Sequence, residues 1–296
     1  MIIISDRPGQ LCNRLWAYTP LISFCLKYDI QLRVLYFNNY HTNFSDVNCK
    51  KNIKIGSLKS YNSYRLARRL IRFSTKYQIV KLSKKIKIHS GTFDSYDKLI
   101  NELKDKNRIH FVKAWRQPYD QNLIDEQKDE ILEIFRPNSN TVRYVDEFFI
   151  KNTLSDQIIV GVHIRKKDYK SFLNGRYYFD DSVYFNAMNQ LKEQLNKTGV
   201  NNIKFLLCSD SYIDLNSFKS LNTISLQESS AINDLYALSK CDYILGPPST
   251  FSMWASFYGN VPLAFIEAKD EKIKVSDFSP IVARDIFENG KTYRPS

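Results

Sequence analysis

The segment that most constrains the fold is a short apolar run, Ile158–Val162, with a charged segment directly after it. The run is continuous and rich in β-branched residues, as in a strand buried on both faces of a parallel sheet. The residues from His163 to Tyr169 then supply an imidazole, three cations, a carboxylate and a phenol. In an open α/β sheet, ligands bind outside the carboxyl ends of the strands. The segment therefore predicts either an anion site at the end of a central strand or a solvated basic loop.

Strand and helix patterns alternate along the whole chain. Residues 1–4 read as a strand, Pro8 and Gly9 mark a turn-rich loop, and a helix follows to about Tyr28. This alternation predicts an α/β fold with doubly wound parallel sheets. The other expected strands are 31–37, 108–115, 158–164, 203–208, 243–246 and 261–266, and the other expected helices are 122–135, 142–151, 181–195, 231–239 and 251–258.

The length of 296 residues favours two domains, 1–150 and 151–296. A polar segment at 138–141 marks the transition between the two halves. No stretch approaches the length of a membrane span, and the N-terminus lacks the pattern of a signal peptide. We therefore expect a cytoplasmic protein.

Net charge is +12, and it is concentrated in one region. Residues 50–91 contain thirteen Lys and Arg and no Asp or Glu, which favours an anionic partner. Apolar residues from Leu66 to Val80 recur at helical spacing, so the region predicts an ordinary surface helix or an interfacial helix on anionic lipid. Nineteen tyrosines and the charge also suit a nucleic-acid-binding protein, although no recognised nucleic-acid motif occurs.

The five cysteines are widely spaced and form no C-x-x-C pair. This pattern favours reduced, mostly buried thiols over disulfides or zinc ligands. The chain contains no H-E-x-x-H, EF-hand or Walker A sequence, so we expect no dedicated metal site.

Polar side chains follow three of the expected strands in the second half, and parallel strands would bring them to one sheet edge. Arg165 offers a bidentate fork for a phosphate oxygen, and His163 can add a second donor. Ser249 and Thr250 precede a helix, where they form an anion site or a plain N-cap. Asp210 either accepts from N1–H and N2–H of a guanine or caps its own loop.

Four motifs in this order resemble those of the α-1,2- and α-1,6-fucosyltransferase superfamily. His163–Asp168 resembles the H-x-R-R-x-D motif, with Lys166 in place of the second arginine. Ser249–Trp254 resembles the S-T-F-S-x-W element of the bacterial α-1,2-fucosyltransferases, and Phe205–Asp210 resembles an F-x-x-x-S-D segment. Gly9–Arg14 is similar to the G-x-L-G-N-Q loop of the same enzymes, without its paired glycines.

This resemblance implies a GT-B fold, in which two Rossmann-like domains face a cleft. Residues 1–150 would form the acceptor side and residues 151–296 the nucleotide-sugar side. The implied reaction is inverting, metal-independent transfer of L-fucose from GDP-β-L-fucose to a hydroxyl of a glycan. That glycan would be a surface polysaccharide or a lipid-linked oligosaccharide, and basic residues 50–91 would then contact an anionic membrane. The alternatives are another nucleotide sugar, a sugar-binding relative without activity, or a basic protein that binds nucleic acid.

The resemblance also implies roles for individual residues. Arg165 would stabilise the charge that develops on the β-phosphate as the glycosidic bond breaks. The implied catalytic residues are Arg165, His163 and Asp168, and the implied donor-binding residues are Gly9, Asn13, Arg14, His163, Arg165, Asp210, Ser249, Thr250 and Phe251.

The general base, if the reaction needs one, stays open at this stage. Asp168 lies within the motif but suits the orientation of Arg165 or Lys166 better. Asp6 and Asp120 in the first half are the alternatives, and the sequence does not rank them.

Overall fold

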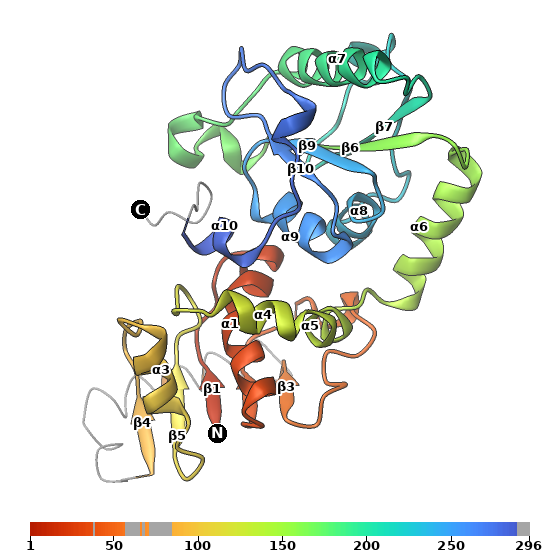
Figure 1. Cartoon of the computed structure of the whole chain (residues 1–296). Coiled ribbons are helices and arrows are strands. Elements are labelled where there is room, and N and C mark those ends of the chain that lie inside the picture. The colour runs from red at the N-terminus through yellow and green to blue at the C-terminus, as the bar shows by residue number, and fades with distance from the viewer. Residues whose placement is uncertain (38, 57–65, 67–68, 71–84, 289–296) are drawn as a thin grey trace. The chain divides into compact units, whose positions relative to one another are not determined.

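The computed structural model describes residues 1–37, 39–56, 66, 69–70 and 85–288. The chain divides into two compact units, Met1–Asn138 and Ser139–Ser296. Each unit has its own five-stranded parallel sheet with helices packed on it (Figure 1). The predicted α/β architecture with two parallel sheets is therefore confirmed.

The sheet of the first unit has the strand order β3-β2-β1-β5-β4. β1 lies in the middle and pairs in parallel with β2 and β5. The connection from β1 to β2 runs through α1 (Leu11–Lys27), which is buried along most of its length. The strands of this sheet are β1 (Ile2–Ile4), β2 (Leu32–Val34), β3 (Ile53–Ile55), β4 (Ile86–Ile88) and β5 (Ile109–Val112).

Two strands and one α-helix of this unit were not predicted, because they are short and the two strands lie in the basic region. β3 and β4 both have the sequence Ile-Lys-Ile, too short to show a strand period among so many cations. The third is α3 (Tyr96–Leu103), which Ser95 caps by accepting from the Lys98 backbone N–H. The helix expected over 66–80 lies largely outside the described residues.

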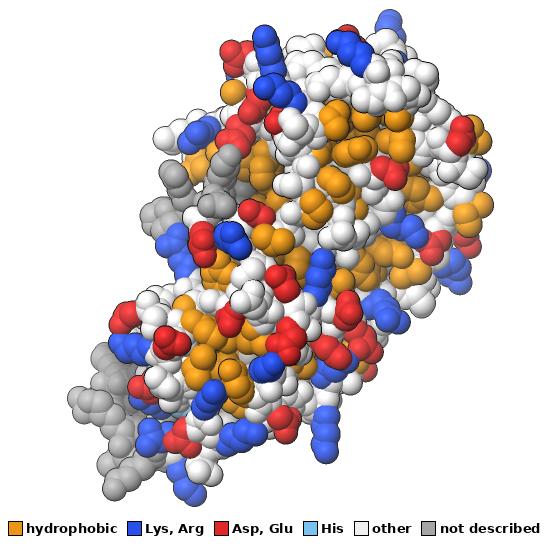
Figure 2. Space-filling view, viewed as in Figure 1, with side chains coloured by type: hydrophobic (Ala, Val, Ile, Leu, Met, Phe, Trp, Pro, Cys, Tyr) orange, Lys and Arg blue, Asp and Glu red, His pale blue; other side chains and the backbone are white. Residues whose placement is uncertain are grey.

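The helix predicted over 122–135 consists of two helices. α4 (Gln121–Glu126) and α5 (Lys128–Ile134) meet at Gln127, whose φ of −100° and ψ of 11° depart from helical values. On the face shown in Figure 2, cationic and acidic side chains are interspersed over the described parts of both units. The described Lys and Arg side chains are thus not gathered into one patch on that face.

The second unit begins with α6 (Ser139–Asn152), so the division precedes α6 and does not fall at residue 150. α6 joins the second unit because it packs against α8 (Ala231–Leu238). Thr141 Oγ1 donates to Asn233 Oδ1 at 3.0 Å, and Asp146 pairs with Lys240.

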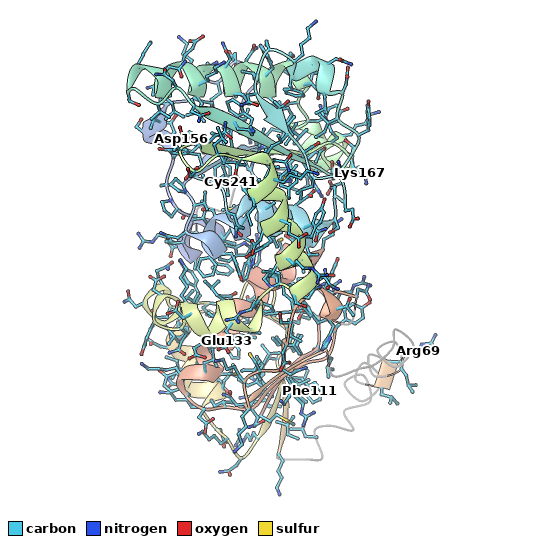
Figure 3. The ribbon with its side chains drawn as sticks, turned by 90° about the vertical axis from the view of Figure 1, so that its right-hand side faces the viewer. Arg69, Phe111, Glu133, Asp156, Lys167 and Cys241 are labelled. Carbon is cyan, nitrogen blue, oxygen red and sulfur yellow. The ribbon has the colours of Figure 1, made fainter. Side chains whose placement is uncertain are left out.

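The sheet of the second unit has the strand order β10-β9-β6-β7-β8. β6, the strand predicted first from the sequence, lies at its centre and pairs with β7 and β9. Figure 3 labels the residues that flank it, Asp156 just before the strand and Lys167 just after it. The strands of this second sheet are β6 (Ile158–Ile164), β7 (Ile203–Ser209), β8 (Thr223–Ile224), β9 (Tyr243–Gly246) and β10 (Leu263–Phe265).

One hydrophobic core of this unit forms between the sheet and α7 (Asp181–Lys197). Tyr184, Met188 and Leu191 from α7 are fully buried against β6 and β7. The unit also contains α9 (Thr250–Gly259) and α10 (Ala283–Phe287). Short 3-10 helices occur at His41–Asn43 in the first unit and at Asp168–Lys170, Phe172–Gly175, Leu215–Phe218 and Val275–Asp277 in the second.

Within the described residues, none of the helices is long and apolar enough to span a bilayer. The same part of the chain contains no disulfide. Four cysteines are buried and Cys49 is exposed, so the prediction of mostly buried thiols is confirmed.

The close approach of α8 and α9 gives a stability prediction. A Cβ on Gly259 would lie 1.9 Å from the carbonyl oxygen of Ser239, a backbone atom that cannot move aside cheaply. Gly259→Ala should lower the free energy of unfolding by about 2 kcal/mol or more. Gly91→Ala is the control, since a Cβ there meets nothing within 4 Å, and its effect should stay within about 0.5 kcal/mol. Urea unfolding of both variants measures this difference, and equal midpoints would contradict it.

Candidate active site

The strand order of the second unit places a topological switch point between β6 and β9. From β6 the chain proceeds outward to β7 and β8 on one side, then returns to β9 on the other side of β6. Ligands of open α/β sheets bind at such points, outside the carboxyl ends of the strands. The residues after β6, from Arg165, and after β9, from Pro247 to Thr250, lie at this edge.

Arg165 is the central cation of this edge, and its guanidinium has a defined orientation. Nη1 lies 3.1 Å from Asp210 Oδ2, and Nη2 lies 2.8 Å from Asp168 Oδ1. The guanidinium carbon is 5.4 Å from the centre of the Tyr169 ring. Nε is buried and has no hydrogen-bond partner within the described part of the chain. Arg165 is therefore held in place by two carboxylates and an aromatic ring, with Nε buried behind them.

The two carboxylates around Arg165 differ in exposure. The Asp210 side chain is 14% exposed, whereas that of Asp168 is 52% exposed. Asp210 is also fixed from a second direction, because its Oδ1 accepts from the Lys166 backbone N–H at 2.9 Å. Both Asp210 oxygens thus face the loop after β6, whereas Asp168 is the more exposed partner of the guanidinium.

Lys166 points away from Arg165 into the unit. Its ammonium donates to the carbonyl oxygen of Phe179 at 2.6 Å and pairs with Asp181 at 2.8 Å. The rings of Tyr178 and Tyr184 lie 5.7 and 5.5 Å from it. This residue therefore anchors the loop to the start of α7.

His163 is buried at the end of β6, with 2% of its surface exposed. Its ring centre lies 5.0 Å from that of Phe251, the second residue of α9. Burial, reinforced by the charge of Arg165, lowers the pKa of His163 to about 3, so the imidazole is neutral at physiological pH. Nδ1 is buried without a hydrogen-bond partner in the described structure. The ring is a packed, neutral group rather than a base that titrates near pH 7.

The loop after β9 is tied to the loop after β6. Tyr169 donates its hydroxyl to the carbonyl oxygen of Pro248 at 2.6 Å. Gly246 admits no side chain, because a Cβ would lie 2.6 Å from the carbonyl oxygen of His163. The two strand ends are therefore held against each other.

Ser249 is the N-cap of α9, the simpler of its two predicted roles. Its Oγ accepts from the Phe251 backbone N–H at 3.2 Å, and its side chain is buried. The helix itself begins at Thr250. The start of α9 thus lies beside His163 and presents the positive end of the helix dipole to this edge.

The predicted residues Gly9, Asn13 and Arg14 lie in the first unit, at the start of α1. Gly9 has a φ of +44°, and a Cβ there would clash with Asn13 Nδ2 at 2.2 Å. Arg14 is fully buried, and its Nε and Nη2 donate to the carbonyl oxygen of Gly9 at 3.3 Å. The rings of Tyr36 and Tyr40 lie 5.1 and 4.8 Å from its guanidinium. Arg14 therefore stabilises this loop from inside.

The two acidic residues considered as bases in the first unit both bind backbone. Asp6 accepts from the N–H groups of Ala114 and Trp115 at 2.8 and 3.2 Å. Burial raises the pKa of Asp6. Asp120 caps α4 by accepting from the Leu123 N–H at 3.3 Å. Both contacts hold loops in place, which gives each carboxylate a structural task.

Sequence reasoning did not single out Asp234, in the first turn of α8. This carboxyl is 6% exposed, and burial raises its pKa to about 7 despite a hydrogen bond from Ser229 Oγ at 2.8 Å. Burial raises the pKa of the Cys208 thiol, near the end of β7, and the nearby charge of Asp234 raises it further. No motif or spacing signals it, because its burial depends on how α8 packs on the sheet.

The described residues contain no group of three His, Cys, Asp or Glu side chains that could hold a metal ion. At the β6–β9 edge, the groups described are the guanidinium of Arg165 and the start of α9.

Comparison with known proteins places this arrangement in context. The family model described as "Glycosyl transferase family 11" matches residues 1–273. Among curated protein sequences, none matches the chain.

Several solved structures share the fold at low sequence identity. The fucosyltransferase NodZ from Bradyrhizobium is 17% identical, with a TM-score of 0.54 over 90% of this chain and 96% of that chain. NodZ α-1,6-fucosyltransferase soaked with GDP-fucose gives a TM-score of 0.55 at 15% identity, over 92% and 97% of the two chains. A mutant of Arabidopsis thaliana FUT1 in complex with GDP gives 0.55 at 12% identity, over 94% and 72%. The fold is therefore GT-B, as in these fucosyltransferases.

The buried His163 gives a prediction for the pH dependence of stability. Its folded pKa of about 3 lies below the unfolded value of about 6.5, so the unfolded state binds more protons between these values. The unfolding free energy should therefore fall as pH falls from about 6.5 towards 3, with up to about 1.4 kcal/mol per pH unit from this residue. His163→Phe should show a slope between pH 6 and 4 that is smaller by about this amount.

The control is Phe251→Leu, which alters the same contact without removing a titrating group and should keep the wild-type slope. Urea unfolding at each pH measures the slopes, and a His163→Phe slope equal to wild type would refute the assignment.

Proposed function

We propose that this chain, which belongs to glycosyl transferase family 11 and is therefore a glycosyltransferase, moves L-fucose from GDP-β-L-fucose to a hydroxyl of a glycan. The second unit binds the donor and the first unit provides the acceptor side. The GT-B fold that the chain shares with fucosyltransferases, one of them soaked with GDP-fucose, supports this donor. We further propose that the reaction inverts the configuration at the anomeric carbon and needs no divalent cation.

The orientation of Arg165 is the observation that carries this proposal. Its guanidinium lies at the switch point between β6 and β9, and Asp210 holds it there. As the glycosidic C–O bond breaks, negative charge accumulates on the β-phosphate while the sugar gains oxocarbenium character. A guanidinium that is already oriented stabilises this charge more than it stabilises the ground state. In this role Arg165 replaces the cation that a metal ion would supply.

The neighbouring groups have supporting roles in this proposal. Asp210 orients Arg165, and Asp168 is the exposed partner that the diphosphate displaces. The start of α9, at Thr250 and Phe251, favours binding of the second phosphate of the donor through the helix dipole. His163 is a neutral neighbour that packs on Phe251 and positions this helix start.

Two carboxyls, of Asp210 and Asp234, are candidates for reading the guanine base. Asp210 is the residue that the sequence suggests, yet both of its oxygens already face the β6 loop. Asp234 lies in the first turn of the helix after β8, and burial there strengthens a hydrogen bond to a base. Pairing with N1–H and N2–H distinguishes guanine from adenine and uracil.

The residues of the first unit that the resemblance assigns to donor binding, and the membrane contact, also belong to the proposal. Gly9, Asn13 and Arg14 shape the loop after β1 at the switch point of the first sheet, between β1 and β5. The acceptor is a glycan, either a surface polysaccharide or a lipid-linked oligosaccharide. Peripheral contact with anionic lipid through residues 50–91 remains a prediction, since much of that region lies outside the described residues. General-base catalysis by Asp168 is the alternative to its displacement.

Removal of Arg165 tests the mechanism. Arg165→Ala should slow the release of fucose from GDP-fucose, to water or to an acceptor, at a cost of about 3 kcal/mol or more. The control is Arg176→Ala, which removes an exposed arginine from the same loop region and should leave the rate near that of wild type. GDP release is followed by a coupled assay. Turnover near normal in Arg165→Ala would remove this residue from catalysis.

The base-reading residue is tested by comparing GDP with inosine diphosphate, which lacks the N2 amino group. At about pH 8, where the Asp234 carboxyl is mostly ionised, wild type should prefer GDP to UDP and ADP by at least about tenfold. It should prefer GDP to inosine diphosphate by one hydrogen bond to a charged group, about 1.5–3 kcal/mol. If Asp234 reads the base, Asp234→Asn abolishes the second preference and Asp210→Asn keeps it. The reverse pattern assigns the base to Asp210. Isothermal titration measures all four affinities, and the absence of any preference for GDP would reject the donor.

A further inference from the structure

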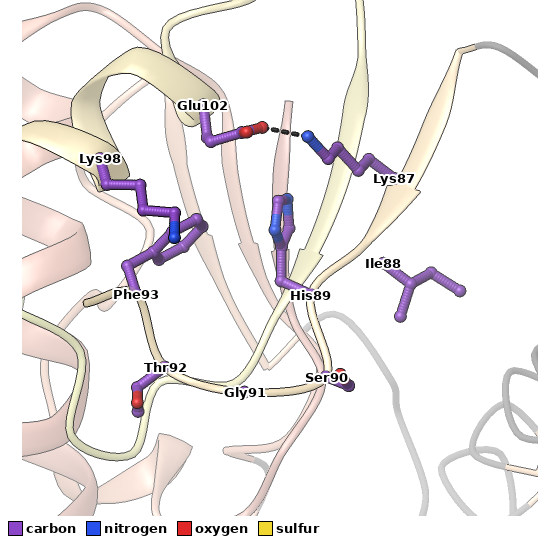
Figure 4. Close-up of a pocket in the computed structure, with 9 residues that line it drawn as sticks. All are labelled: Lys87, Ile88, His89, Ser90, Gly91, Thr92, Phe93, Lys98 and Glu102. Carbon is purple, nitrogen blue, oxygen red and sulfur yellow. Dashed lines mark hydrogen bonds and ion pairs between the residues drawn. The ribbon is translucent and has the colours of Figure 1, made fainter. Parts of the chain in front are cut away.

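The first unit contains a pocket that the proposed donor site does not use. It lies between β4, the loop after it and α3, with a cavity volume of about 270 Å³. Figure 4 shows Lys87 and His89 on one side of this space and Phe93 and Lys98 on the other. Glu102 from α3 lies above it and pairs with Lys87. The pocket thus combines aromatic, cationic and acidic groups from three consecutive segments.

The loop that lines this pocket is held in one conformation by a buried side chain. Gln117 is 2% exposed, and its Oε1 accepts from the Phe93 backbone N–H at 3.2 Å. Its Nε2 donates to the carbonyl oxygens of Lys113 at 2.6 Å and Gly91 at 3.4 Å. One amide therefore joins the loop after β4 to the loop after β5. Such preorganisation lowers the entropic cost of binding a ligand.

The aromatic side of the pocket is rigid and uncharged. The ring centres of His89 and Phe93 lie 4.8 Å apart. His89 Nε2 lies 3.1 Å from Nδ1 of His110, a fully buried residue of β5, and this contact fixes the orientation of the imidazole. Burial, with help from the charges of His110 and Lys87, lowers the pKa of His89 to about 4 and keeps it neutral. A partly apolar aromatic surface of this kind suits the C–H face of a sugar ring.

The charges around the pocket are already balanced by their own partners. Lys87 pairs with Glu102, and Lys98 pairs with Asp94. An anionic ligand such as phosphate would have to displace these carboxylates and would be repelled by them. A neutral polyol meets hydrogen-bond donors and acceptors together, without displacing either pair. The charge pattern therefore selects against a phosphate and for a neutral ligand.

We propose that this pocket binds an uncharged sugar residue, with Phe93 as the stacking platform and the Lys87–Glu102 pair as the polar edge. The assignment of that sugar to the acceptor glycan rests on the proposed function, whereas the binding of a neutral sugar does not. In the acceptor role, the pocket holds a glycan residue in the first unit while the donor is bound by the second. It thereby contributes to the choice of acceptor.

Binding is tested by saturation-transfer NMR with the full-length protein and a panel of uncharged methyl glycosides, in the presence of saturating GDP. At least one glycoside should give transfer signals in wild type. Phe93→Ala should weaken its binding by about tenfold, whereas Phe93→Tyr, which keeps an aromatic ring, should retain it. Ile150→Ala is the matched control, since it removes an apolar side chain that is 81% exposed in the second unit and should leave binding unchanged.

Three results would overturn the proposal: no glycoside binds, Phe93→Ala binds as wild type does, or inorganic phosphate at equal concentration displaces the glycoside. GDP affinity and GDP-fucose hydrolysis are measured on the same preparations. Loss of glycoside binding with normal GDP binding rejects only the sugar pocket. Absence of GDP binding together with normal glycoside binding rejects only the proposed donor.

Discussion

The ion pair between Arg165 and Asp210 joins the loops after two neighbouring strands, and the organisation of the candidate site depends on it. β6 and β7 pair over their whole lengths, which brings these loops to one edge of the sheet. Asp210 then binds Arg165 through one oxygen and the Lys166 N–H through the other. Because the carboxylate is largely buried, its attraction for the guanidinium is weakly screened by solvent. The cation is therefore oriented before any ligand arrives.

Most of the fold could be predicted from hydrophobic patterns, but several short elements could not. Long apolar runs such as β6 and β7 stood out, because burial on both faces leaves few polar residues within them. β3, β4 and β8 have three, three and two residues, and a period cannot be recognised in so few positions. The break at Gln127 was also invisible, since Gln is a good helix former and nothing local marks an interruption.

The site was predictable as a set of residue types but not as a set of contacts. Polar groups after successive strands pointed to one edge, and strand order then made β9 the neighbour of β6. The sequence could not show that the Ser249 hydroxyl accepts from the Phe251 N–H as a helix cap. It also could not show that the buried Arg14 side chain donates to the carbonyl oxygen of Gly9. It also could not reveal Asp234 or the Gln117 bridge. Those features depend on which buried polar group meets which partner, and only tertiary packing decides that.

The separate cores of the two units have a consequence for how such a chain can change over evolutionary time. The loop that carries Phe93 is fixed by Gln117, and both belong to the first unit. Arg165 is held by contacts that lie entirely within the second unit. Substitutions of Phe93 or Gln117 therefore remove none of the described contacts that orient the guanidinium. Under the proposed function, the sugar that the first unit binds can diverge while the contacts around Arg165 are inherited unchanged.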